Sequence, residues 1–223
     1  MNTIVQYDLP VTMIARPSLQ KVLRHRKLKN TLIVVIVMLF GIGLFFYILK
    51  DRLLLTYKNL ESTVVSDRNG LIIAIKPNSK GHYAYYMDSL PSRFKNFLVQ
   101  KEDRFFYEHA GVNPVSSLRA LYVYMKTGTP GASSTVTQQL AKNLLGNEQD
   151  RTLLNKLEEV IYSVALELFL SKEKILTMYG NTVYMGNSIQ GFTEASESYF
   201  GKRLADLSDT EIFFASREFI STR

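Results

Sequence analysis

The chain of 223 residues contains no cysteine, and this absence excludes several kinds of site. It rules out a disulfide framework, a thiolate zinc site and a cysteine nucleophile. The sequence also has no glycine-rich phosphate loop followed by Lys-Ser or Lys-Thr and no HExxH zinc pattern, so neither of these sites is supported. No internal repeat or low-complexity segment is present, and 46% of the residues are hydrophobic. We therefore expect a folded chain with room for one domain plus an anchor.

Positive charge is concentrated near the N-terminus. The formal net charge of the chain is +7, and most of it lies in residues 1–49. This segment has a single acidic residue, Asp8, against these basic ones: Arg16, Lys21, Arg24, Arg26, Lys27 and Lys29. A nucleic-acid-binding protein would spread its basic residues over a folded face, whereas here they are bunched beside an apolar run. We therefore expect no nucleic-acid partner.

An apolar run follows the basic segment, from Thr31 to Leu49, and it contains neither charge nor proline. As a helix it would span about 28 Å, which is close to the hydrocarbon thickness of a bilayer. A core helix would show a polar face, and a cleavable signal peptide would have a shorter apolar region and a nearby cleavage site. We therefore predict a retained transmembrane helix. The positive-inside rule places residues 1–30 in the cytoplasm and the chain after Lys50 outside. The basic tail could also bind anionic lipid, although a role in setting the topology alone is favoured.

The remainder is predicted to be mostly helical, with one small β element. Residues 62–76 have two β-branched runs around Asn69-Gly70, a strong turn signal, and this pattern predicts a β-hairpin. Helical patterns dominate from Pro91 onward, including one that begins at the good N-cap residue Ser134. The expected organisation is a basic tail, a transmembrane helix, a linker with the hairpin and a main domain, over residues 1–30, 31–49, 50–90 and 91–223.

Three polar clusters interrupt the apolar helical pattern. They are Lys101-Glu102-Asp103 with His109, the Ser/Thr/Gln-rich segment 134–143, and Lys156 with Glu158-Glu159. A carboxylate can act as a base, while lysines and hydroxyls can neutralise a phosphate. The clusters therefore suit transfer at a sugar carbon with an anionic leaving group. The residues alone leave ordinary solvated helix faces as an alternative.

Five segments, taken in order, resemble the motifs of one family. They are EDRFFYEHAG (102–111, EDxxFxxHxG), STVTQQLAKN (134–143, STITQQxxKN), KLEE (156–159, RKxxE), ILTMYGN (175–181, ILxxYLN), and Gly191-Phe192 with Ala195 and YFGK (199–202). The family is glycosyltransferase family 51, the peptidoglycan glycosyltransferases, which comprises the monofunctional transglycosylases and the polymerase domain of class A penicillin-binding proteins. Five motifs in the right order make a chance match very improbable.

The resemblance implies a mostly helical fold, with a lysozyme-like lobe and a smaller membrane-proximal lobe. It implies that the substrate is lipid II, a disaccharide-pentapeptide on undecaprenyl pyrophosphate. An inverting transfer would extend the glycan strand and release the lipid pyrophosphate. The implied partners are the growing strand, membrane lipid and other cell-wall synthesis proteins, at the bacterial inner membrane. The resemblance also allows a divalent metal cofactor, Mg²⁺ or Mn²⁺, with no certain ligand.

The motifs also imply roles for individual residues. Glu102 would be the general base, and Glu159 would organise cations or a metal near the donor pyrophosphate. Lys142, Lys156 and Arg151 would neutralise the leaving group. The other expected substrate-binding residues are Asp103, Phe106, His109, Ser134, Thr135, Thr137, Gln138, Gln139 and Asn143, although His109 is also expected to hydrogen-bond within its own loop. The segment 118–126 fits the lipid-contacting lobe or, alternatively, a plain core helix.

The sequence departs from the family pattern at several positions. Asn155 replaces the arginine of the third motif, Gly180 replaces the leucine of the fourth, and Ala132-Ser133 replaces a glycine-containing pair. The end at Arg223 leaves no room for a transpeptidase domain, so we expect a short monofunctional form, a truncated product or a decayed copy. A weakly active module that binds lipid II or a cell-wall partner, and a glycan-cleaving lytic enzyme, are the alternative functions.

Overall fold

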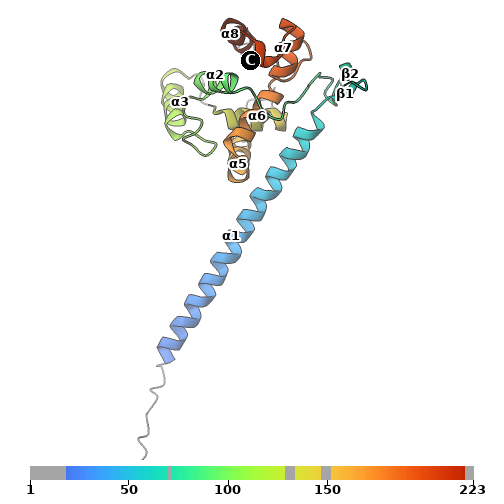
Figure 1. Ribbon diagram of the computed structural model, residues 1–223. Coiled ribbons are helices and arrows are strands. Elements are labelled where there is room, and N and C mark those ends of the chain that lie inside the picture. Colours follow the sequence, from blue (N-terminus) through green and yellow to red (C-terminus); the bar gives the residue numbers. More distant parts are fainter. Residues whose placement is uncertain (1–18, 70–71, 129–133, 147–151, 219–223) are drawn as a thin grey trace, which may run out of the picture. The chain divides into compact units, whose positions relative to one another are not determined.

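The computed structural model describes residues 19–69, 72–128, 134–146 and 152–218 (Figure 1). Within these ranges the chain forms helices α1 to α8, one short 3-10 helix, η1, and a two-stranded sheet. The predicted fold class is therefore confirmed as mostly α, with a short hairpin and one apolar helix near the N-terminus. The chain divides into two compact units, Met1–Gly43 and Leu44–Arg223, and α1 runs across the boundary.

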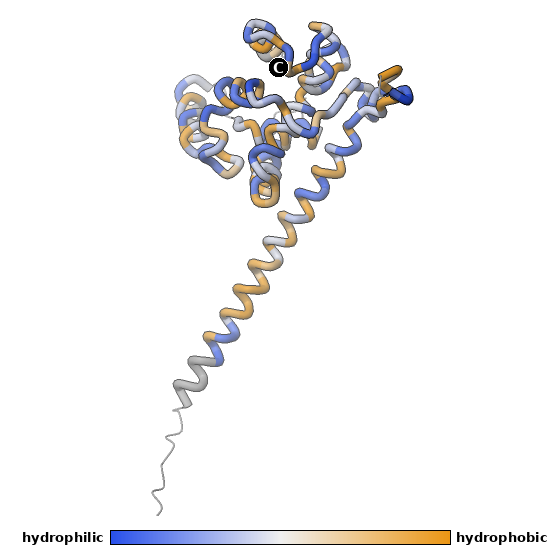
Figure 2. The backbone as a smooth tube through the Cα atoms, viewed as in Figure 1, coloured by the Kyte–Doolittle hydropathy of each residue, from blue (hydrophilic) through white to orange (hydrophobic). Residues whose placement is uncertain are grey.

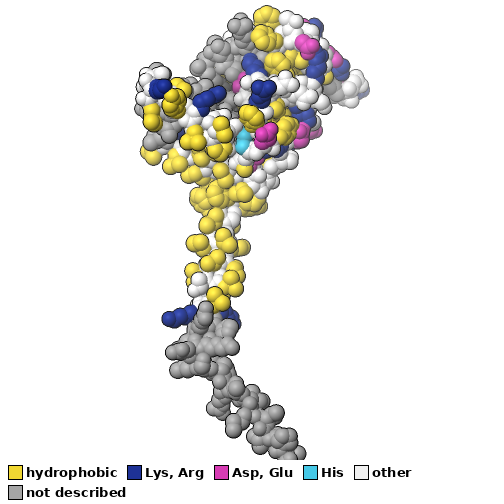
Figure 3. Space-filling model, turned by 90° about the vertical axis from the view of Figure 1, so that its left-hand side faces the viewer, with side chains coloured by type: hydrophobic (Ala, Val, Ile, Leu, Met, Phe, Trp, Pro, Cys, Tyr) yellow, Lys and Arg dark blue, Asp and Glu magenta, His cyan; other side chains and the backbone are white. Residues whose placement is uncertain are grey.

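Helix α1 spans Leu19–Asn59 and contains the whole apolar run (Figure 2). Its segment Arg26–Asn59 has a mean hydropathy of 3.0 in its most apolar stretch, none of which is buried. The hydrophobic side chains of this stretch are therefore exposed along the helix, as Figure 3 shows. Among the described residues, α1 is the one helix long and apolar enough to cross a membrane. This agrees with the predicted transmembrane helix.

The predicted hairpin is present. Strands β1 (Thr63–Ser66) and β2 (Ile72–Lys76) pair antiparallel, with Thr63 opposite Lys76 and a register shift between Val65 and Ser66. The Asp67 side chain accepts a hydrogen bond of 2.8 Å from the backbone N–H of Asn69, as expected for a turn of this composition.

The remaining helices form the main domain. Their bounds are α2 Ser92–Glu102, α3 Pro114–Thr127, α4 Val136–Leu145, α5 Leu153–Phe169, α6 Lys172–Thr182, α7 Phe192–Phe200, η1 Leu204–Asp206 and α8 Asp209–Glu218. Helix α4 packs against both α5 and α6, while α7 packs against α6, η1 and α8. Helix α4, which carries most of the second motif, therefore contacts the helices that carry the third and fourth motifs.

A single apolar cluster holds this domain together. It includes Phe94 and Leu98 from α2, Leu140 from α4 and Tyr179 from α6, all fully buried. Burying a large apolar side chain contributes about 1.5–3 kcal/mol, so this cluster supplies much of the stability that fixes the helices. Leu53, near the end of α1, is also part of it.

The structure explains one departure from the family pattern. A Cβ atom on Gly180 would lie 2.6 Å from Cδ1 of Leu90, and Leu90 is itself buried. The Leu90 side chain therefore occupies the space that a larger residue would need.

Candidate active site

A capping box starts helix α4. The Thr135 side chain accepts a hydrogen bond from the Gln138 backbone N–H (3.1 Å), and Gln138 Oε1 accepts one from the Thr135 N–H (3.2 Å). The expectation that Ser134 would be the N-cap was therefore wrong by one residue. The reason is local, because Thr135 has a glutamine three positions later and Ser134 has Thr137 there. The Ser134 hydroxyl is left available for another contact.

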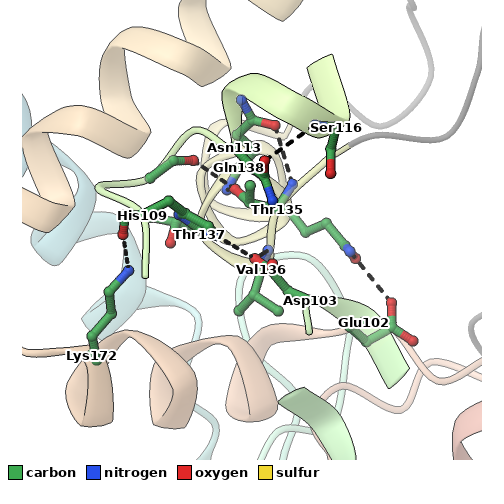
Figure 4. Close-up of polar contacts among 12 residues, drawn as sticks. Glu102, Asp103, His109, Asn113, Ser116, Thr135, Val136, Thr137, Gln138 and Lys172 are labelled. Carbon is green, nitrogen blue, oxygen red and sulfur yellow. Dashed lines mark hydrogen bonds and ion pairs between the residues drawn. The ribbon is translucent and has the colours of Figure 1, made fainter. Parts of the chain in front are cut away.

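Asp103 joins the end of α2 to the start of α4. Its buried carboxylate Oδ2 accepts a 3.0 Å hydrogen bond from the Val136 backbone N–H and lies 2.9 Å from Nε2 of His109 (Figure 4). A carboxylate is favoured there because the first N–H groups of a helix lack partners within the helix. His109 thus bonds within its own loop, as expected.

Glu102 is the last residue of α2 and lies partly buried beside α4. Its Oε2 accepts a long hydrogen bond, 3.4 Å, from Nε2 of Gln139. The hydroxyl of Tyr179 donates to Oε1 of Gln139 at 3.1 Å, which turns the amide N–H₂ toward Glu102. Of the two phenylalanines that follow, Phe105 is exposed and Phe106 is fully buried in the core. The Glu102 carboxylate is therefore held only loosely by its own contacts.

A second charged group lies where α5 begins. The Lys156 ammonium donates to Oγ of Ser134 at 2.7 Å and to Oε2 of Glu159 at 2.8 Å. Glu159 is buried, whereas the Lys156 side chain is 39% exposed and retains donor capacity toward solvent. Asn155 occupies the predicted arginine position in the first turn of α5, where its backbone N–H is capped by Thr152 (3.1 Å).

Lys142 and Asn143 lie in the last turns of α4. Lys142 is partly exposed and follows Gln139 by three residues, so the two side chains project from the same side of the helix. Asn143 is 1% exposed, and its amide has no hydrogen-bond partner among the described residues. Arg151 lies outside the residues that the structure describes.

Several predicted contact residues point into the domain. Thr137 donates to Oε1 of Glu167 at 2.6 Å, and Gln138 completes the capping box. Phe106 packs in the core. These side chains frame the site, and their direct contact with substrate stays a prediction.

The sequence motifs do not include two residues of this region, Glu167 and Lys172. Lys172 donates to Glu167 Oε1 at 2.8 Å and to the His109 backbone carbonyl at 2.5 Å. The two members of this oppositely charged pair are five positions apart across the α5–α6 corner, and that spacing was the only sequence signal.

The described residues form no protein-only metal centre, since no group of three or more His, Asp or Glu side chains could hold an ion. Mg²⁺ often keeps several waters and binds one or two carboxylates together with substrate phosphates. One oxygen of Glu159 already pairs with the Lys156 ammonium, so a role of this kind would fall to its other oxygen and stays a prediction.

Two groups therefore flank α4. Glu102 meets it at Gln139, and the Lys156–Glu159 pair meets Ser134 immediately before it. One group offers a loosely bound carboxylate and the other an exposed cation. This arrangement can accept a proton at one place and stabilise negative charge at another.

Comparison with known proteins supports the family resemblance that the motifs indicated. Residues 69–216 match the family model described as Transglycosylase. Penicillin-binding protein 1B of Haemophilus influenzae is 35% identical over 164 residues, which are 71% of this chain and 21% of that protein. Penicillin-binding protein 1F of Bacillus subtilis is 34% identical over 166 residues, 74% of this chain and 22% of that protein. Penicillin-binding protein 1A of Aquifex aeolicus is 34% identical over 158 residues, 70% and 22% respectively. The chain thus spans about a fifth of the length of these curated relatives, and it belongs to the transglycosylase family, as its five motifs indicated.

Proposed function

We propose that this chain polymerises lipid II into peptidoglycan glycan strands by inverting glycosyl transfer, with loss of undecaprenyl pyrophosphate. The observation that carries the proposal is that Glu102, on α2, and the Lys156–Glu159 pair, on α5, both contact α4 or the residue immediately before it. A base and a cation that meet the same helix suit a reaction that removes a proton and expels a diphosphate.

Glu102 acts on the acceptor. Its carboxylate takes the proton from the GlcNAc 4-hydroxyl as that oxygen attacks the anomeric carbon of the donor strand. The Gln139 amide holds one carboxylate oxygen, and Tyr179 holds the amide. General-base catalysis of this kind typically contributes 10²–10⁴-fold to a rate.

Lys156 acts on the donor. The bond from the anomeric carbon to the pyrophosphate breaks, and the negative charge that develops is stabilised by Lys156, with Lys142 as its partner in this role. Such stabilisation is effective because the cation is in place before the charge forms. Glu159 orients Lys156, and the Ser134 hydroxyl lies where it can donate to a sugar or phosphate oxygen. A divalent ion at Glu159 would supply further positive charge to the diphosphate.

The surface of α3 fits a lipid-borne substrate. Val115, Leu118 and Met125 are 77%, 66% and 74% exposed, and Tyr122 is half exposed with Lys126 Nζ 4.7 Å from its ring centroid. Within the segment 118–126, the exposure of Leu118, Tyr122 and Met125 favours the lipid-contacting lobe over the plain core helix. Aromatic and cationic side chains beside apolar ones are typical of a membrane interface.

The proposed location is the bacterial cytoplasmic membrane. Helix α1 would cross it once, with the basic residues before the apolar run in the cytoplasm and the helical domain outside. This topology places the domain where the donor and acceptor strands are assembled.

One assay tests the function. Purified full-length protein in detergent is given fluorescent lipid II with Mg²⁺ or Mn²⁺, and products are separated by length. Long strands made by the wild type and lost in Glu102→Gln support the proposal. Saturable binding without polymer would instead favour the lipid II-binding alternative, to which the missing arginine at Asn155 points. Fragments released from sacculi would favour the lytic enzyme.

A further inference from the structure

Lys172, the first residue of α6, lies outside the five motifs but contacts residues of the first one. Its ammonium donates to the His109 backbone carbonyl at 2.5 Å (Figure 4) and to Glu167 Oε1 at 2.8 Å. It also lies 4.5 Å from the centroid of the Phe106 ring. The Lys172 side chain is 21% exposed and that of Glu167 is 6% exposed. The ion pair is therefore largely buried, and removing either partner would strand a charge.

Glu167 connects this pair to the second motif. The same oxygen, Oε1, accepts the hydroxyl hydrogen of Thr137 at 2.6 Å. Thr137 belongs to the first turn of α4, so the pair joins the α5–α6 corner to the helix that carries Gln139.

The loop 103–113 is consequently held from two sides. On the α4 side, Asp103 accepts from the Val136 N–H, and the Gly111 carbonyl accepts from the Thr135 hydroxyl at 2.6 Å. On the other side, Lys172 holds the carbonyl of His109. Glu102 immediately precedes this loop, so the loop sets the position from which its side chain projects.

Close packing of the loop against α5 depends on Gly111. Its φ of +85° is in the region that favours glycine, and an added Cβ would lie 2.9 Å from the Ser163 carbonyl oxygen and 3.2 Å from Cγ of Glu167. The backbone therefore approaches α5 directly beside the Glu167–Lys172 pair.

We propose that Lys172 and Glu167 are positioning residues, which hold the loop 103–113 so that the Glu102 carboxylate stays aligned for proton transfer. The inference rests on the proposed function, because it assigns Glu102 the role of base. The pair acts through the loop and touches no reacting atom. The loop must help to position Glu102, because the hydrogen bond from Gln139 to its carboxylate is long, 3.4 Å, and holds it weakly.

The test compares full-length variants in the lipid II assay. Lys172→Met keeps the length of the side chain but removes its charge and donors, whereas Lys172→Arg keeps both. Lys174→Met is the matched control, since Lys174 is an exposed lysine of the same helix and lies outside the five motifs. We expect Lys172→Met to lower kcat by roughly 10–100-fold, with the KM for lipid II within about twofold, because small misplacements of a catalytic group have effects of this size. We expect Lys172→Arg to recover most of the rate and Lys174→Met to be unchanged.

Hydrogen exchange supplies a readout that does not depend on activity. We expect the amides of residues 103–113 to exchange faster in Lys172→Met, while those of α7 keep the wild-type rate. A wild-type kcat, or a loss of kcat that follows a uniform rise in exchange over the whole domain, would overturn the inference. If the wild type makes no polymer, the proposed function fails. The exchange measurement still tests the pair in that case, because faster exchange confined to residues 103–113 would show that Lys172 and Glu167 hold this loop. Should Lys172→Met not fold, Glu167→Gln gives the same comparison with a smaller disturbance, because the amide oxygen can still accept from Thr137.

Discussion

The loop 103–113 and the first turns of α5 flank the same helix, α4, but are attached to it differently. The loop is fixed by buried contacts at Asp103, His109 and Gly111, on two sides. The α5 segment meets the α4 region through the exposed Lys156 ammonium at Ser134, and the neighbouring Leu154 is 76% exposed.

This difference matches what each side must do in the proposed reaction. Proton transfer requires the base to lie within hydrogen-bond reach of the hydroxyl, so a small displacement is costly. Attraction between a cation and a diphosphate falls only gradually with distance, so Lys156 tolerates more movement. We therefore expect loss of the base on the loop side to be more damaging than loss of the cation on the α5 side.

The largest expected effect is that of Glu102→Gln. The amide has nearly the same shape as the carboxylate but cannot accept the proton, so we expect glycan polymerisation to fall by about 10²–10⁴-fold. Strand formation from fluorescent lipid II measures it. Glu108→Gln is the control, because Glu108 is an exposed acid of the same loop and should retain wild-type activity. If Glu102→Gln and Glu108→Gln lose the same amount of activity, Glu102 has no special role as the base.

A smaller loss is expected on the α5 side. Lys156→Met removes the exposed cation, and we expect kcat/KM for lipid II to fall by about 10–100-fold through weaker stabilisation of the leaving group. Lys156→Arg keeps the positive charge on a side chain of different shape. We expect it to restore more activity than a charge-conserving substitution on the loop side would.

The control for Lys156 is Lys174→Met, which removes another exposed lysine, on α6. A Lys156→Met enzyme that is as impaired as Glu102→Gln would contradict the tolerance expected of this side. An unimpaired Lys156→Met enzyme would remove Lys156 from the mechanism.

Tight packing of the loop can be tested by stability. Gly111→Ala should destabilise the domain by about 2–4 kcal/mol, of which ~1 kcal/mol comes from the left-handed backbone and the remainder from overpacking against α5. Gly81→Ala is the matched control, because Gly81 has a φ of +76° and nothing within 4 Å of its added Cβ. Denaturant unfolding of both variants separates the two contributions. Equal destabilisation would show that the approach of Gly111 to Ser163 is not tight.

Local patterns in the sequence were enough to predict much of this architecture. The hairpin at residues 62–76 and the apolar helix follow from short-range turn and hydropathy signals, and both are present. The motifs also directed attention to Glu102, Gln139 and Lys156, which the structure places on α2, α4 and α5. Their catalytic roles remain predictions.

Contacts between distant residues could not be predicted in the same way. The Lys172–His109 bond joins residues 63 positions apart, and no periodicity or spacing encodes it. The N-cap of α4 was misplaced because Ser134 and Thr135 are both good caps, and the reciprocal bond from Gln138 decides between them. Gly180 became explicable only when Leu90 was seen to fill the space beside it.

The smallest expected effect lies on the surface, far from either side of α4. Ser208 and Glu211 form a capping box at the start of α8, and Lys202 pairs with Glu211. The hydrogen bond from Lys202, followed by those from Ser208, lowers the pKa of Glu211 from its usual 4.5 to about 2. A depressed pKa means that the folded state binds this proton less readily than the unfolded state does. The contribution of Glu211 to stability is therefore complete above about pH 4.5 and is lost as the pH falls toward 2.

Glu211→Gln should therefore weaken the pH dependence of stability slightly in the acid range and leave the lipid II kinetics unchanged. Thermal unfolding between pH 2 and 5 measures this effect, and Glu108→Gln is the control that removes another acid. If Glu211→Gln leaves the pH dependence of stability unchanged over this range, the ionisation of Glu211 in the α8 cap does not contribute to stability.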